Sequence, residues 1–386
     1  MTTVPRILIV IGTRPEAIKM APVHEALCRL APALETKVAL SGQHLDLVEP
    51  AIDVFGIVPD YRLNVMREGQ DVADVVSRVL RDLRTILREA APDVLLVQGD
   101  TATVFAASLA GFLEKVKVGH VEAGLRSHDR YAPFPEEILR RLTDVASEYH
   151  FAPTIRARDE LLRENTSPDT VFVTGNTVVD ALLSVARRER PVRDPSLAEI
   201  RSRVRGGEAR LVLLTAHRRE AFGPPLTEIF RAVRDVADAH LDVCVLYPVH
   251  PNPNVLVPAR ESLADHPRIH LTEPLDYLDL VAALESAALV MTDSGGIQEE
   301  APTFATPVLV LRDVTERPEG VEAGVAELVG TDRRLIAERA RAALSREPGR
   351  EPPRNPYGDG RAGERIADIL AADLLGRTRR LEDWTG

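Results

Sequence analysis

The sequence predicts an α/β fold in which two domains each contain an open, parallel sheet. Short β-branched runs that end in glycine or a polar residue alternate with longer stretches whose apolar residues recur at helical spacing, as in parallel strands joined by helices. The chain has 386 residues, a length that suits two or three domains. The alternation lapses over residues 186–209, which are charged and contain Pro and Gly, and then resumes. We therefore expect two α/β domains joined by a polar connection.

The expected elements follow from these runs. In the first series, strands are expected at 6–12, 36–42, 92–100, 116–120, 149–154 and 170–176. Residues 72–90 carry apolar side chains on one face of an expected helix. In the second series, strands are expected at 210–217, 241–250, 268–274, 288–296, 306–313 and 326–330. We assign residues 1–180 to an N-terminal domain, 181–360 to a C-terminal domain, and 361–386 to a helix that returns to the N-terminal domain.

Composition excludes several classes of protein. Hydrophobic residues make up 45% of the chain, enough for a sizeable core, and the net charge of −11 argues against a nucleic-acid-binding surface. The two cysteines, Cys28 and Cys244, have no metal-site spacing and are expected to be reduced core residues. The N-terminal apolar run is too short for a signal peptide or a membrane span. We expect a soluble, cytoplasmic protein.

Polar residues follow nearly every expected strand. Ligands of open α/β sheets bind beyond the carboxyl ends of the strands, so these positions are the informative ones. They are Gly12–Arg14, Gln43 and His44, Gly99 and Asp100, His120 and Glu122, His217–Arg219, His250, Asp293 and Ser294, and Arg312 and Asp313. We expect the two edges to face each other across a cleft between the domains.

Two strand-to-helix turns suggest an anion site. Arg14 and Lys19 lie near the start of a helix that Pro15 opens, where the helix dipole already favours an anion; a solvated cation pair is the alternative. In the second turn, the double glycine 295–296 follows a strand and a serine, so backbone N–H groups can approach a phosphate closely. Plain helix capping by Ser294 is the alternative there.

Three acids and a histidine suggest proton-transfer chemistry. Asp100, Glu122 and Glu136 follow neighbouring strands or lie on the loop beyond them, and His217 ends a strand of the second series. Asp100 could instead be a helix N-cap, Glu136 a first-turn acid, and His217 a structural histidine. Glu122 has neither alternative. Acids that share a partly buried site are typical of general acid–base catalysis, and the spacing implies no metal.

Several ordered blocks carry a resemblance to a known family. They are "GTRPEAIKMAP", "GHVEAGLRS", "FPEE", "TGNTVVDALL", "HRREAFG", "YPVHPNPNV", "TDSGGIQEEAP", "TERPEG" and "NPYGDG", between about residues 6 and 361. Together they resemble the non-hydrolysing UDP-N-acetylglucosamine 2-epimerases. The resemblance implies two Rossmann-like domains of the glycosyltransferase-B type with the active site in the cleft between them. It also implies interconversion of UDP-N-acetylglucosamine and UDP-N-acetylmannosamine through a 2-acetamidoglucal, without cofactor or metal.

The resemblance also implies roles for particular residues, matched motif by motif. The catalytic set is Asp100, Glu122, Glu136 and His217. The UDP contacts are Arg14, Lys19, Tyr277, Ser294, Gly295, Gly296, Glu300 and Arg317. A second UDP-N-acetylglucosamine, acting as an activator, would lie near Gln43, His44, Glu136, Arg218 or Arg219, and His250. A homodimer is expected.

The chain departs from the family pattern at four positions. Leu45 and Asp46 replace a basic and a polar residue, Leu139 replaces an asparagine, and Ala221 replaces a polar residue. These changes leave the activator response and the exact UDP-sugar open. The alternatives are a hydrolysing epimerase that releases N-acetylmannosamine and UDP, an epimerase of a modified UDP-sugar, a retaining glycosyltransferase, and a UDP-sugar sensor without catalysis.

Overall fold

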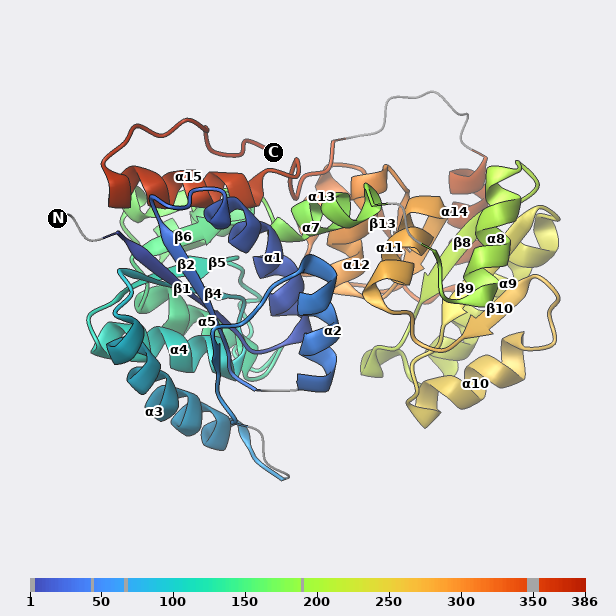
Figure 1. Cartoon of the computed structure of the whole chain (residues 1–386). Coiled ribbons are helices and arrows are strands. Elements are labelled where there is room, and N and C mark those ends of the chain that lie inside the picture. Colours follow the sequence, from blue (N-terminus) through green and yellow to red (C-terminus); the bar gives the residue numbers. More distant parts are fainter. Residues whose placement is uncertain (1–3, 43–44, 66–68, 189–190, 346–353) are drawn as a thin grey trace. The chain divides into compact units, whose positions relative to one another are not determined.

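The computed structural model divides the chain into two compact units (Figure 1). It describes residues 4–42, 45–65, 69–188, 191–345 and 354–386, and of residues 45–47 only the backbone. The first unit comprises Met1–Ala181 together with Tyr357–Gly386, and the second comprises Leu182–Pro356. The sequence-based boundaries were 180 and 360. The chain therefore crosses between the units twice, once in the helix Thr177–Ala186 and once just before Tyr357.

Within its described residues, the first unit contains a seven-stranded parallel sheet in the order β3-β2-β1-β4-β5-β6-β7. The strands are β1 (Arg6–Ile11), β2 (Glu35–Leu40), β3 (Tyr61–Arg62), β4 (Val94–Gln98), β5 (Lys117–Val121), β6 (Tyr149–Ala152) and β7 (Val171–Val173). The sequence predicted all of these strands except β3, which is only two residues long. The central strands are buried along their length because helices cover both faces of the sheet.

The helices of the first unit form two packed groups. They are α1 (Arg14–Cys28), α2 (Leu45–Phe55), α3 (Val72–Ala90), α4 (Ala102–Leu113), α5 (Glu136–Val145), α6 (Ile155–Arg163), α7 (Thr177–Ala186) and α15 (Ala362–Leu375). Helix α4 packs between α3 and α5, whereas α1 packs against α2 and the C-terminal α15. Figure 1 shows these two groups on opposite faces of the sheet.

Helix α3 shows how local sequence determines an element. Asp71 caps its first turn by accepting a hydrogen bond from the Asp74 N–H at 2.9 Å, and the Asp74 carboxylate accepts one from the Asp71 N–H at 3.2 Å. The predicted apolar face is the buried one, with Val75, Val79 and Leu83 four residues apart against the sheet.

The second unit repeats the architecture with a six-stranded parallel sheet among its described residues, in the order β10-β9-β8-β11-β12-β13. The strands are β8 (Arg210–Thr215), β9 (Val243–Pro248), β10 (Ile269–Thr272), β11 (Ala287–Thr292), β12 (Val308–Val310) and β13 (Ala326–Leu328). The helices are α8 (Pro195–Arg205), α9 (Pro224–Ala239), α10 (Pro253–Leu263), α11 (Tyr277–Ser286), α12 (Gly295–Glu300), α13 (Pro318–Glu322) and α14 (Arg333–Leu344). The sequence predicted each of these strands.

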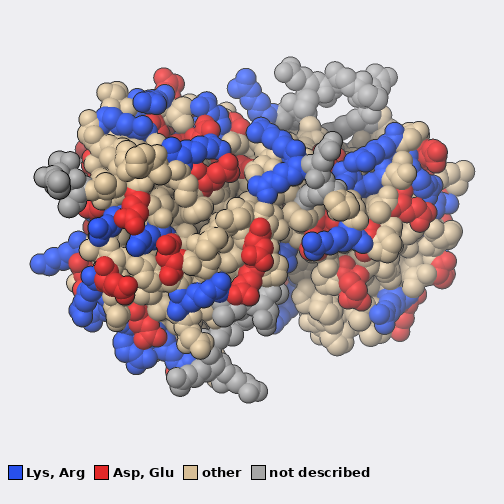
Figure 2. Space-filling model, in the orientation of Figure 1, with Lys and Arg blue, Asp and Glu red and all other residues tan. Residues whose placement is uncertain are grey.

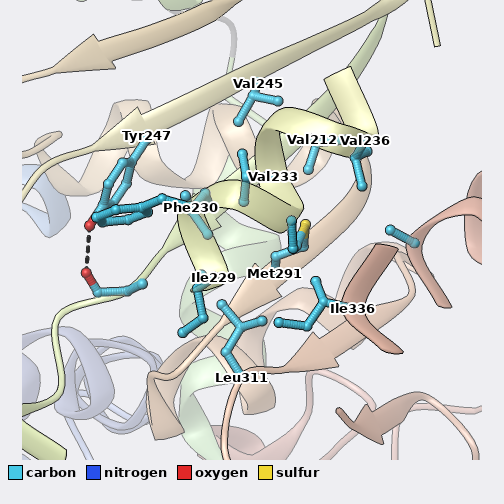
Figure 3. Packing of buried hydrophobic residues seen from close by; sticks show 14 of the residues in the cluster. Val212, Ile229, Phe230, Val233, Val236, Val245, Tyr247, Met291, Leu311 and Ile336 are labelled. Carbon is cyan, nitrogen blue, oxygen red and sulfur yellow. Dashed lines mark hydrogen bonds between the residues drawn. The ribbon is translucent and has the colours of Figure 1, made fainter. Parts of the chain in front are cut away.

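The core of the second unit lies between its sheet and the helices α9 and α14 (Figure 3). Val212, Val245 and Met291 project from three strands onto Phe230 of α9 and Ile336 of α14. One polar atom lies within this core, the hydroxyl of Tyr247, and it donates a 2.6 Å hydrogen bond to the carbonyl oxygen of Ala216. This bond ties the end of β8 to β9.

Each sheet has a switch point, the place where the strand order reverses direction. In the first unit the switch lies between β1 and β4, and in the second it lies between β8 and β11. Connections leave these paired strands toward opposite faces, so a crevice opens at their carboxyl ends. The turns after β1, β4, β8 and β11 contain Gly12, Gly99, His217 and Ser294, which the sequence singled out.

The surface mixes both signs of charge, and in Figure 2 basic and acidic side chains alternate over the visible face of each unit.

The two cysteines differ in exposure. Cys244 is buried as expected, but the expectation for Cys28 was wrong, because it lies exposed at the end of α1. Among the described residues, no helix is both long and apolar enough to traverse a bilayer.

The buried Tyr247 hydroxyl gives a stability prediction. Tyr247→Phe should lower the free energy of unfolding by about 1 kcal/mol, because the Ala216 carbonyl loses its donor in a buried place. Chemical denaturation measures the change. Tyr131→Phe, which removes a hydroxyl from a side chain that is 70% exposed, serves as the control and should leave stability unchanged. Equal stability of Tyr247→Phe and wild type would contradict the role of this hydrogen bond.

Candidate functional site

At the switch point of the first unit, the turn after β1 is held by the buried carboxylate of Glu16. It accepts hydrogen bonds from the Gly12 N–H at 2.6 Å, the Thr13 hydroxyl at 3.0 Å and the Thr101 hydroxyl at 2.9 Å. Burial raises the pKa of the Glu16 carboxyl to about 7, although these hydrogen bonds oppose the rise. Gly12 is required by close packing, because a Cβ there would lie 2.7 Å from Oγ1 of Thr103.

Glu122 lies directly after β5 and is 92% buried, with a left-handed backbone at φ 69°. Its carboxylate accepts hydrogen bonds from the Lys19 ammonium at 2.6 and 2.8 Å and from the Asn176 amide at 3.3 Å. The Gln98 side-chain amide donates a further, short hydrogen bond. A non-glycine residue at positive φ is uncommon and persists where surrounding contacts determine it. Glu122 therefore faces a cation and two amides that come from α1, β4 and the turn after β7.

Asp100 follows the neighbouring strand β4 and forms an ion pair with Arg140 of α5. Nε of Arg140 donates at 3.1 Å, and Nη2 donates a second, short hydrogen bond to the same carboxylate oxygen. Arg140 also contacts the buried carboxylate of Glu137 at 3.1 Å. The helix-capping alternative for Asp100 is wrong, because Thr101 is the N-cap of α4.

Glu136 is the first residue of α5, as the sequence predicted. It is half-buried, and its Oε2 atom has no hydrogen-bond partner within the part of the chain that the structure describes. A buried carboxylate oxygen without a partner is uncommon in native proteins and calls for an explanation, such as a ligand. Leu139, which replaces the family's asparagine, is buried one turn further along the same helix.

At the switch point of the second unit, the buried carboxylate of Asp293 organises the turn after β8. It accepts hydrogen bonds from the backbone N–H groups of His217 at 2.6 Å and Arg218 at 2.7 Å. The His217 ring stacks on the His250 ring, with 5.5 Å between centroids. Burial lowers the pKa of the His217 imidazole, and the nearby His250 and Arg218 add to this effect, whereas Asp293 opposes it. His217 is therefore a neutral imidazole near pH 7.

The turn after β11 leads into α12, and there is space beside the backbone of Gly295. Ser294 occupies the N-cap position but makes no side-chain capping hydrogen bond. A Cβ at Gly295 would approach only Nη2 of Arg218, at 4.0 Å. Nearby, Arg317 forms a short ion pair with the buried carboxylate of Glu299. Tyr277 begins α11 and is buried.

The structure brings the predicted residues together in two groups, one in each unit. In the first unit, Arg14, Lys19, Asp100, Glu122 and Glu136 belong to elements that begin or end at the carboxyl edge of the sheet. In the second unit, His217, Arg218, His250, Ser294, Gly295, Gly296, Glu300 and Arg317 belong to turns and helices that follow the strands. Gln43 and His44, expected near an activator, lie outside the described residues.

Sequence reasoning missed several partners of these residues. Glu16, Gln98, Glu137, Arg140, Asn176, Asp144 and Asp293 were not given a role, although all but Arg140 and Asp144 lie within a block or an expected strand that was noted. The signal that could have found Arg140 and Asp144 is their spacing on α5, which places both on the same helical face as Glu136 and Glu137. No group of three or more His, Cys, Asp or Glu side chains within the described residues has an arrangement that would hold a metal ion.

Two doubly wound sheets, each with ionisable side chains at its switch point, define the class of two-domain α/β enzymes with Rossmann-like domains. The family described as UDP-N-acetylglucosamine 2-epimerase matches residues 27–371. The UDP-N-acetylglucosamine 2-epimerase of Escherichia coli (strain K12) is 46% identical over 376 residues, covering 95% of this chain and 98% of that protein. The chain belongs to the UDP-N-acetylglucosamine 2-epimerase family, and it is therefore an enzyme of the isomerase class.

Solved structures confirm the predicted fold. A crystal structure from Listeria monocytogenes superposes with a TM-score of 0.91 and 42% identity, covering 100% of both chains. The UDP-GlcNAc 2-epimerase of Neisseria meningitidis, solved with UDP-GlcNAc bound, superposes with a TM-score of 0.81 and 38% identity, covering 96% of this chain and 100% of that chain.

The buried Glu16 carboxyl gives a pH prediction. A carboxyl whose pKa rises from 4.5 to about 7 on folding contributes stability that is fully present below pH 4.5 and is lost as the pH rises to about 7. In Glu16→Gln the free energy of unfolding should therefore fall less between pH 4.5 and about 7 than it does in the wild type. Urea denaturation at several pH values measures this free energy.

Glu114→Gln is the control for this experiment. Hydrogen bonds from Arg88 and Arg84 lower the pKa of the Glu114 carboxyl from 4.5 to about 2, so its contribution to stability changes mainly below pH 4.5. This variant should keep the pH dependence of the wild type. The same slope in Glu16→Gln and wild type would contradict a protonated Glu16 in the folded protein.

Proposed function

We propose that the protein interconverts UDP-N-acetylglucosamine and UDP-N-acetylmannosamine by eliminating UDP across C1–C2 and adding it back through a 2-acetamidoglucal. The observation that carries this proposal is the pair of carboxylates after the adjacent strands β4 and β5, with Asp100 held by Arg140 and Glu122 held by Lys19, Gln98 and Asn176. Epimerisation at C2 needs a proton removed from one face and returned to the other, and two fixed carboxyl groups suit that task.

The proposed reaction has two halves that balance in atoms and electrons. In the first, a carboxylate takes the C2 proton, the C2–H electron pair becomes the C1=C2 double bond, and the C1–O bond breaks with its electrons leaving on UDP. In the second, a carboxyl returns a proton to the opposite face of C2, and a diphosphate oxygen of UDP bonds to C1. We assign Asp100 and Glu122 to these transfers, with Glu136 in support because its buried Oε2 lacks a partner among the described residues.

The departing diphosphate needs positive charge and N–H donors, and the second unit supplies both kinds of group. We propose that the backbone of Gly295 and Gly296, with Ser294, Arg317 and His217, holds the diphosphate, and that Tyr277 and Glu300 contact the uridine. Donors fixed before the reaction stabilise developing charge without reorganisation. Arg14 and Lys19 are proposed as further UDP contacts.

The two alternatives that survive are a hydrolysing epimerase and an epimerase of a modified UDP-sugar. In a hydrolysing epimerase, water would attack the intermediate or C1, and free N-acetylmannosamine would accumulate. The buried Leu139 and Ala221 mark where a modified sugar would be accommodated differently, because both lie within a few residues of Glu136, Arg218 and His217. An activator site at Arg218 and His250 is likewise a proposal.

Deuterium exchange tests the function. Wild-type protein incubated with UDP-N-acetylglucosamine in deuterated buffer should give a mixture of the two UDP-sugars, each carrying deuterium at C2, by NMR. Asp100→Asn and Glu122→Gln should each lose about 10²- to 10⁴-fold in the exchange rate, because each removes a group that transfers a proton. Both variants should still bind UDP in calorimetric titrations.

Asp82→Asn, on the exposed side of α3, is the control and should keep wild-type exchange. Accumulation of free N-acetylmannosamine would support the hydrolysing alternative. Exchange that survives at the wild-type rate in both site variants would overturn the assignment of the acids.

We also propose that the protein forms a homodimer in a reducing compartment, the cytoplasm. Helices α4 and α5 pack together and expose Phe112, Leu113, Leu142 and Val145, whose exposed fractions are 59%, 50%, 44% and 84%. Neighbouring exposed apolar side chains of this size are typical of a protein–protein interface.

The two cysteines are free thiols, which suits a reducing compartment.

Val145→Glu should weaken the proposed dimer by tenfold or more, because it places a charge among apolar side chains that would be buried. Analytical ultracentrifugation across a concentration series measures the change. Leu241→Glu is the control, since Leu241 is 80% exposed and belongs to the second unit. A monomer in the wild type, or equal dissociation of Val145→Glu and wild type, would contradict this interface.

A further inference from the structure

His120 lies on β5, two residues before Glu122, and its side chain is completely buried. Its two ring nitrogens contact different elements. Nδ1 lies 2.6 Å from the carboxylate of Asp144 on α5, and Nε2 lies 2.7 Å from the carbonyl oxygen of Gly99 in the turn that carries Asp100.

Both partners of the ring are hydrogen-bond acceptors. A carbonyl oxygen cannot donate, and the other oxygen of Asp144 accepts a 2.7 Å hydrogen bond from Arg126. Burial raises the pKa of the Asp144 carboxyl, but the His120 and Arg126 charges outweigh it and hold that pKa below its usual value. The ring therefore bridges the Asp144 carboxylate on α5 and the Gly99 carbonyl oxygen in the turn after β4.

An ion-pair network surrounds this ring. The Arg126 side chain is buried like that of His120 and bridges the buried Asp144 to the more exposed Glu164 at 2.8 Å, while Arg141 approaches Glu164 at 3.2 Å from the surface. Buried charges such as those of Arg126 and Asp144 persist when they are paired and hydrogen-bonded in this way.

The hydrogen bonds of His120 complete a closed series of contacts that includes Asp100. The Gly99 carbonyl oxygen accepts a hydrogen bond from the imidazole, and the next residue, Asp100, forms an ion pair with Arg140. Arg140 lies one helical turn before Asp144 on α5, and the Asp144 carboxylate contacts the imidazole. His120 therefore links the two elements whose relative position determines where the Asp100 carboxylate lies. The same helix carries Glu136 at its first turn.

His150 offers a contrast on the neighbouring strand β6. It is also buried, and its Nε2 donates to the backbone carbonyl of Asp144 at 2.9 Å. Its other nitrogen lies 3.3 Å from the Thr170 carbonyl, in a different part of the unit. His150 therefore contacts α5 as His120 does but has no link to the Gly99–Asp100 turn.

We propose that His120 is a positioning residue for Asp100, a buried histidine whose ring fixes the Gly99–Asp100 turn against α5. This inference rests on the proposed epimerase function, because its effect is read in the C2 exchange reaction. The ring touches no substrate in this proposal and acts only through the turn and the helix.

The kinetic test compares His120→Gln with His150→Gln in the deuterium-exchange assay. Displacing a reacting group by about 1 Å can cost 10²-fold, so His120→Gln should lower kcat by about 100-fold while leaving KM close to wild type. His150→Gln should lose a similar amount of thermal stability and keep wild-type kcat. The proposal fails if His120→Gln keeps wild-type kcat, or if both variants lose kcat equally. No exchange in the wild type would instead mean that the proposed function fails.

Discussion

The ion pair between Lys19 and Glu122 is the interaction on which the arrangement of the first unit's site depends. The two side chains are 15% and 6% exposed, so each charge is largely removed from water and needs the other. Removing one partner of such a pair typically costs about 3–5 kcal/mol, because the remaining charge stays buried without compensation. Since Lys19 belongs to α1 and Glu122 follows β5, the pair fixes the first helix against the far side of the switch point. Gln98 and Asn176 add contacts from β4 and from the turn after β7.

The same principle governs the rest of both sites, where charged groups lie at the carboxyl edge of a sheet and each is held by a partner from another element. Arg140 holds Asp100, Asp293 holds the turn at His217, and Glu299 holds Arg317. An arginine suits a position that must bind a buried carboxylate and also an anionic ligand, because its planar guanidinium presents donors along more than one edge. Lys19 can contact both carboxylate oxygens of Glu122 because its ammonium group carries three N–H donors.

The fold could be predicted from the sequence because its signals are local. Runs such as Arg6–Ile11 and Arg210–Thr215 are apolar along their whole length, as strands buried on both faces must be, and α3 shows its apolar face and its cap within twenty residues. The strand ends could be predicted for the same reason. The pairing of side chains could not, because Lys19 and Glu122 are 103 residues apart in the sequence and Glu16 and Thr101 are 85 apart. The exposure of Cys28 likewise depends on what packs against the end of α1 and not on its apolar neighbours.

Glu122 shows why chemistry and local preference conflict at such a site. A glutamate at φ 69° costs about 1–2 kcal/mol relative to an ordinary backbone, and glycine would relieve that cost. The left-handed turn, however, lets the Glu122 and Ala123 N–H groups both donate to the Phe151 carbonyl at 3.0 and 3.2 Å, so the backbone stays paired with β6. From this conformation the carboxylate, which lies immediately past a buried strand, reaches both Lys19 and Gln98. The residue is therefore explained by the position of its side chain, and its backbone strain is offset by the four hydrogen bonds that its carboxylate accepts.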